Sequence, residues 1–193
     1  NQYNGVSLRS AYFVRSYVHG VASDKVPLAK YRNPAWAQKF AYLMGQAAAL
    51  DLVVGRRNSI TRELLFDRNY EVVTTGEDGL PAEIRITDHA GSFVDYERPL
   101  ADFASEYAAF ATRRAKYVTE YPTFVAAYVE GFRRHLAETQ AAYRARRRAF
   151  DNLFSDRPYD TNGSGAYRWA CALRRLDACD PDALAAQLKA AIA

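Results

Sequence analysis

The sequence has few of the residues that cross-link small proteins or bind transition metals. Among 193 residues there are two cysteines, Cys171 and Cys179, and three scattered histidines. Two cysteines without a histidine close by do not make a zinc site. They would pair only in an oxidising compartment, and the sequence leaves open whether they form a disulfide or two free thiols.

Long apolar runs and the familiar catalytic motifs are also missing. No run approaches the roughly 18 apolar residues of a membrane span. The sequence contains no phosphate-binding glycine-rich loop, no His-Glu-x-x-His, no Gly-x-Ser-x-Gly and no Cys-x-x-Cys. The chain begins at Asn1 rather than at methionine. We therefore expect a processed or trimmed fragment of a longer chain, and the sequence leaves the compartment open between secretion and the cytoplasm.

What the sequence does contain is alanine, tyrosine and phenylalanine in helical spacing. Hydrophobic residues make up 49% of the chain, enough for a packed core in one domain over residues 1–193. A loop is expected from Val21 to Asn33. The pattern Trp36, Phe40, Leu43, Ala47 and Leu50 then predicts a strong helix that starts at Asn33-Pro34 and runs to about Val54, where Gly55 offers a stop. Further helices are expected over Ser7–His19, from Pro99, from Pro122, over Tyr167–Leu176 and after Asp180-Pro181, which provides a capping residue.

One region has the two-residue spacing of β-strands instead. Residues 70–75 and 82–88 flank a turn that contains Asp78-Gly79, and Ile84 and Ile86 alternate with charged residues. This pattern predicts a β-hairpin whose isoleucines pack against the helix that carries Phe40 and Leu43. The predicted fold class is therefore mainly α with one β-hairpin (α+β).

Arginines crowd into a segment of the longest predicted helix and the residues after it. The members of this group are Arg133, Arg134, Arg144, Arg146, Arg147 and Arg148. Such runs are typical of a solvated helix face, and the alternative is a patch for phosphate or an acidic partner. No nucleic-acid-binding motif accompanies them, so nucleic acid is not an expected partner.

The window from Asp51 to Phe93 is where chemistry is expected. It reads Asp51-Leu-Val-Val-Gly-Arg-Arg-Asn58-Ser-Ile-Thr-Arg-Glu63, then the hairpin, then Asp88-His-Ala-Gly-Ser-Phe. The order of helix, loop, strand pair and acidic turn resembles the large lobe of the kinase-like superfamily. The resemblance is to its atypical branches: HipA-like, phosphoinositide-kinase-like and Golgi secretory-kinase-like proteins.

The resemblance implies roles for individual residues. Asp88 falls on the metal-binding aspartate, Glu63 on the metal-binding asparagine and Asn58 on the catalytic aspartate. The implied cofactors are Mg²⁺ or Mn²⁺ with ATP, because phosphoryl transfer needs oxygen ligands that hold metal against phosphates. Lys25 and Lys30 precede the window and are the candidates for the lysine that grips a nucleotide.

The window also departs from the family pattern. Asn58 cannot accept a proton, so the ordinary kinase base is missing. The segment before Asp51 is too short for a complete small lobe. Three interpretations stay open: a degenerate kinase-like lobe (a pseudokinase) with a binding or regulatory role, an active atypical phosphotransferase, and an unrelated helical protein-interaction or bacterial effector-like domain. In the last, Asp88 to Phe93 is an ordinary turn.

Overall fold

The long helix α2 (Pro34–Val54) organises the computed structural model. The structure describes residues 20–55, 69–74, 78–87, 96–151 and 165–193, together with the short strand pair β1 (Gln2–Tyr3) and β2 (Val6–Ser7). The predicted helix over Ser7–His19 lies, beyond Ser7, outside the described residues. The prediction for α2 is confirmed at both ends: Asn33 caps the Trp36 N–H at 3.1 Å, and Gly55 ends the helix in the left-handed conformation.

The remaining helices lie mostly where the periodicity predicts them. Pro99 is followed by short 3-10 turns before a helix begins, and α1 lies in a segment expected to be a loop. The elements are α1 (Leu28–Tyr31), the 3-10 turns η1 (Ser23–Lys25), η3 (Leu100–Asp102), η4 (Ala104–Tyr107) and η5 (Ala115–Tyr117), and the helices α3 (Ala108–Arg114), α4 (Tyr121–Ala145), α5 (Arg147–Asp151), α6 (Gly165–Ala178) and α7 (Pro181–Ile192). None of these described helices has the length and apolar character of a membrane span.

The predicted hairpin is present and gains a third strand. β4 (Tyr70–Thr74) pairs antiparallel with β5 (Pro81–Ile86), and β3 (Val21–Ala22) pairs with the other edge of β4. The strand order is therefore β3-β4-β5, with a bulge where Thr74 lies opposite Pro81. β3 is too short to show alternation, which explains why the sequence did not predict it.

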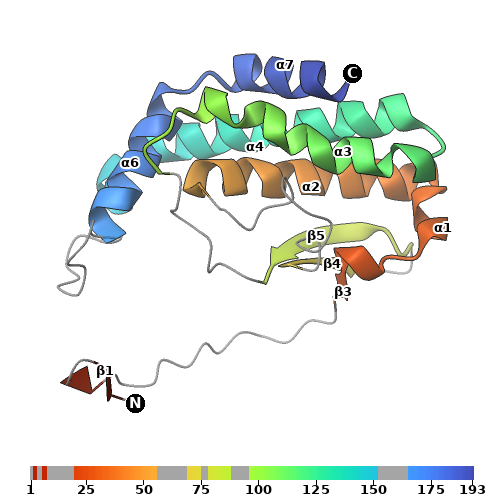
Figure 1. Ribbon diagram of the computed structural model, residues 1–193, viewed down its shortest axis with the longest axis horizontal. Helices are drawn as coiled ribbons and strands as arrows, with labels where there is room; N and C mark the ends of the chain where they lie inside the picture. Colours follow the sequence, from red (N-terminus) through yellow and green to blue (C-terminus); the bar gives the residue numbers. More distant parts are fainter. Residues whose placement is uncertain are drawn as a thin grey trace.

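Helices α3, α4 and α7 lie on one side of α2, and the sheet lies on the other (Figure 1). The sheet contacts α2 through β5, whereas α4 packs along the other side and is itself covered by α7. α2 and α4 run in the same direction, since Ala35 and Thr123 meet at one end and Leu50 and His135 at the other. Fully buried rings fill the space between the helices, among them Phe40, Phe110, Phe124, Tyr128 and Phe132. Phe124, Tyr128 and Phe132 lie on the buried face of α4.

Candidate functional site

The C-terminal end of α2 carries a buried acidic residue. Asp51 is 0% exposed, and its carboxylate accepts a hydrogen bond from the Tyr70 hydroxyl at the start of β4. The Gly55 N–H in turn donates to the carbonyls of Asp51 and Leu52. A buried carboxylate needs such donors, because burial without them is costly. This contact ties the end of the helix to the beginning of the hairpin.

The two ends of the hairpin are hydrogen-bonded to each other. The Thr87 N–H donates to the Asn69 carbonyl at 2.8 Å, one residue beyond the Tyr70–Ile86 pair. Gly55, Asn69 and Thr87 are therefore linked through Asp51 and Tyr70. The predicted site residues Asn58, Glu63 and Asp88 lie outside the described residues. They belong to the segments of sequence that begin after Gly55 and after Thr87.

An arginine that the sequence did not single out also binds this end of α2. Arg175 on α6 donates to the Val53 carbonyl at 2.8 Å and to the Arg98 carbonyl at 2.9 Å. The last carbonyls of a helix lack intrahelical partners and carry partial negative charge, so a cation there is stabilising. Arg175 is 122 residues from Val53 in sequence. No local pattern could have predicted the contact.

The two lysines predicted to grip a nucleotide lie on the segment between β3 and α2. Lys25 is in the η1 turn after β3 and pairs with Asp24 at 3.6 Å. Lys30 is in α1, and its side chain reaches Gly79 in the turn between β4 and β5. A Cβ at Gly79 would lie 3.9 Å from the Lys30 Nζ. That turn adjoins the beginning of α2, because Leu80 and Ala35 line the same pocket. The 21 residues of α2 span about 30 Å, so Lys30 and Gly55 lie at opposite ends of the helix.

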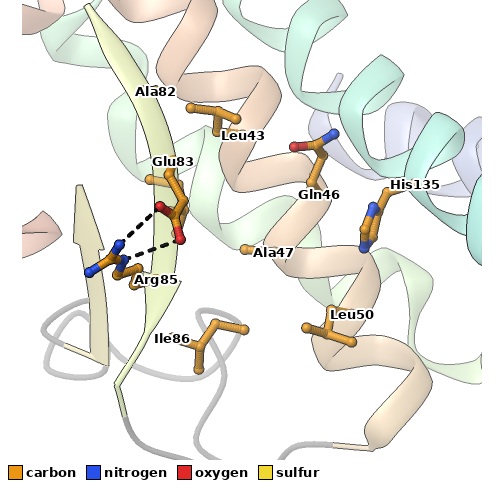
Figure 2. A pocket seen from close by; sticks show the side chains of 10 residues that line it. Leu43, Gln46, Ala47, Leu50, Ala82, Glu83, Arg85, Ile86 and His135 are labelled. Atoms are coloured by element: carbon orange, nitrogen blue, oxygen red, sulfur yellow. Dashed lines mark hydrogen bonds and ion pairs between the residues drawn. The ribbon is translucent and has the colours of Figure 1, made fainter. Parts of the chain in front are cut away.

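A groove runs between α2 and β5 (Figure 2). Its volume is about 550 Å³. Leu43, Gln46, Ala47 and Leu50 of α2 line one side, residues 82–86 of β5 the other, and His135 of α4 stands at the rim. Burial lowers the pKa of His135 below its ordinary 6.5, and Glu138 partly opposes this shift. Glu83 and Arg85 form a bidentate pair with N–O distances of 3.1 and 3.2 Å.

The predicted basic face is largely matched by acidic residues of the same fold. Arg133 binds Glu130 and Asp182, and its hydrogen bond lowers the pKa of the Glu130 carboxyl. Arg134 binds Glu138 at 2.7 Å. Arg144 and Arg147 both bind Asp177, whose carboxyl pKa is lowered chiefly by the hydrogen bond from Arg144. Four of the arginines thus have intramolecular carboxylate partners, as in the solvated-face interpretation.

Both cysteines are free thiols. Cys171 lies inside α6 and Cys179 directly follows the last residue of that helix. Eight positions of helical rise separate them by about 12 Å, beyond the Cα separation of about 7 Å that a disulfide tolerates. The two sulfurs therefore do not pair in this fold.

Among the described ranges, no three histidine, cysteine or acidic side chains come together in a group that could hold a metal ion. Comparisons with protein-family models, with curated proteins and with solved structures found no match to this chain. The geometry at the end of α2 is therefore the basis on which a function is proposed.

Proposed function

We propose that this chain is a degenerate kinase-like lobe that binds a divalent metal ion and serves a binding or regulatory role. One observation carries the proposal: the residues that border the motif, Gly55, Asn69 and Thr87, are linked by hydrogen bonds through Asp51 and Tyr70 near the C-terminal end of α2. A kinase-like site needs its catalytic loop beside its metal-binding turn. Asp88 directly follows Thr87, and Asn58 is three residues beyond Gly55.

The residue types support metal binding more than they support catalysis. Asp88 and Glu63 would supply the carboxylate oxygens that Mg²⁺ or Mn²⁺ prefers. Asn58 stands where the catalytic base is required and has no basic oxygen to accept a proton from an attacking hydroxyl. The proposed site therefore binds metal and phosphate without ordinary phosphoryl transfer. Lys30 takes no part in it, because this lysine lies at the other end of α2.

Thermal unfolding with and without Mn²⁺, Mg²⁺ and ATP tests this proposal. A ligand that binds only the native state raises its apparent stability by RT ln(1 + [L]/Kd), about 2.7 kcal/mol at a hundredfold excess over Kd. We expect metal to raise the Tm of the wild type and Asp88→Asn to remove that gain. Glu63→Gln should reduce it.

The matched control is Asp78→Asn, the same change in the β4–β5 turn. Asp78 is exposed, and its oxygen accepts from the Leu80 N–H at 3.0 Å, a bond that asparagine can retain. This variant should keep the full response to metal. An equal loss in both variants, or no response in the wild type, would contradict the proposal. Phosphate transfer by the wild type would instead identify an active phosphotransferase.

A further inference from the structure

The outer edge of β5 is open among the described strands. β5 is the last strand in the order β3-β4-β5, and Thr87 donates to Asn69 next to the Tyr70–Ile86 pair. Antiparallel bonds recur at every second residue pair. The backbone groups of Glu83 and Arg85 therefore face β4, whereas the N–H and C=O of Ile84 and Ile86 point outward, away from the sheet.

The groove described above lies directly beside this edge. Ile84 and Ile86 are half-buried against α2, and Leu50 is 38% exposed on the far side of the groove. A strand laid along β5 would place every second side chain toward α2, next to Ile84 and Ile86. Leu43, Ala47 and Leu50 would then contact apolar side chains of the added strand, in a space of about 550 Å³.

The opposite face of β5 carries one acidic and one basic side chain. Glu83 and Arg85 alternate with Ile84, and within the part of the chain that the structure describes they form an ion pair with each other. Opposite charges directly across two antiparallel strands stabilise the pair, and like charges destabilise it. An antiparallel strand should therefore place an acidic residue opposite Arg85 and a basic residue opposite Glu83. From its N- to its C-terminus, the residues of the added strand would follow the order apolar–acidic–apolar–basic–apolar.

β5 itself has this pattern, yet a second copy of the chain does not fit. α2 packs chiefly against β5, the edge strand, and also contacts Tyr70 at the start of β4. Pairing β5 with β5 of another copy would place the two α2 helices side by side beneath two strands that are only about 4.8 Å apart. Packed helices need about 8–10 Å between their axes. The edge accepts a lone extended segment and excludes a strand with a helix beneath it.

We propose that β5 binds an extended segment of a partner protein as a fourth strand, with acidic and basic residues flanking a central apolar residue opposite Ile84. Backbone hydrogen bonds to Ile84 and Ile86 hold the segment, the groove over α2 takes its apolar side chains, and Glu83 and Arg85 select its charge order. Strand addition of this kind combines backbone affinity with side-chain specificity.

Two fluorescent peptides of equal composition test the charge order by anisotropy: Thr-Ile-Glu-Ile-Arg-Ile-Thr and Thr-Ile-Arg-Ile-Glu-Ile-Thr. We expect the first to bind the wild type at least about tenfold more tightly, because the second places two like-charge pairs across the strands. The double variant Glu83→Arg/Arg85→Glu preserves the pair within β5 and should reverse the preference. Equal binding of the two peptides, or a preference that survives the exchange, would overturn the proposal.

A second measurement tests the backbone contacts without altering the protein. N-methylation of the central isoleucine of the first peptide removes the N–H that faces Ile84 and should abolish binding. N-methylation of its glutamate removes an N–H that points away from β5 and should leave binding within about twofold. Equal losses from the two modifications would rule out strand addition. A dimer of the chain that the peptide dissociates would show that a second copy is the occupant instead.

Discussion

The two sides of α2 are closed in different ways. Toward α4, Gly45 and Gly131 let the helices meet backbone to backbone: a Cβ on Gly131 would overlap the Tyr42 carbonyl, and one on Gly45 the Tyr128 carbonyl. Toward the sheet, α2 contacts chiefly the edge strand β5, meets β4 through the Asp51–Tyr70 hydrogen bond, and leaves a groove of about 550 Å³. One side has no space for an added methyl group, and the other has space for several side chains.

Because of this difference, we expect the α4 side of α2 to determine stability and the groove on the sheet side to determine binding. Close packing on the α4 side buries large rings and makes any change of volume costly. The sheet side holds one buried polar contact, between Asp51 and Tyr70, and half-buried isoleucines. Substitutions on the α4 side should therefore unfold the protein, whereas those around the groove should change what it binds.

The largest expected effect is that of Phe132→Ala on the α4 side. Phe132 is 0% exposed and lies 6.3 Å from Tyr107 between ring centroids. Its removal should lower the free energy of unfolding by about 3–5 kcal/mol, measured by urea denaturation. Arg134→Ala, an exposed neighbour on the same helix, should leave the urea midpoint nearly unchanged. A loss below about 1 kcal/mol for Phe132→Ala would mean that the ring does not sit in the core.

Gly131→Ala should come next. The added methyl group must push α2 and α4 apart, and overpacking of this kind costs about 3 kcal/mol, the upper end of its usual range. Gly79→Ala is the comparison: its φ of 61° strains alanine, but only Lys30 Nζ lies near, so the cost should be about 1 kcal/mol. Equal losses would show that the contact between α2 and α4 is looser than the structure indicates.

Tyr70→Phe tests the polar contact on the sheet side. It removes the hydroxyl that donates to the buried Asp51 carboxylate, which should cost about 1–3 kcal/mol. Because Asp51 is the link between Gly55 and the hairpin, the same variant should weaken the stabilisation by Mn²⁺ if the proposed metal site is correct. A change in stability with an unaltered metal response would separate the contact from that site.

The smallest expected effect is the dependence of stability on pH through His135, at the rim of the groove. The pKa of the His135 imidazole is below 6.5 in the folded protein. As the pH falls, His135 is therefore protonated at a higher pH in the unfolded chain than in the folded protein. Stability should therefore decrease as pH drops from about 6.5 toward the lower folded pKa. His135→Gln should flatten the urea midpoint over that window. An unchanged slope would show that other groups produce the dependence.

The sequence predicted the elements whose signals are local. The structure confirms four features that depend only on neighbouring residues. They are the cap at Asn33, the stop at Gly55, the start of α7 at Asp180 and the alternation of Ile84 and Ile86. The mainly helical class with a small antiparallel sheet follows from the same signals. The resemblance to kinase-like lobes and the roles of Asn58, Glu63 and Asp88 stay predictions.

Other features required residues that are distant in sequence to meet. β3 is two residues long and becomes a strand only beside β4, and Arg175 reaches the end of α2 across 122 positions. The sequence left the basic segment open between a solvated helix face and a patch for an anion, and the fold places Asp177 and Asp182 beside it, as the solvated face requires.

By itself, then, the sequence determined both ends of α2, the start of α7 and the position of the hairpin, because caps, turns and periodicity act over a few residues. Only the tertiary structure decided which edge of the sheet lacks a neighbouring strand among the described residues, which arginines are neutralised and that Cys171 and Cys179 remain apart. Those properties depend on distances between elements, which local periodicity and capping signals do not encode.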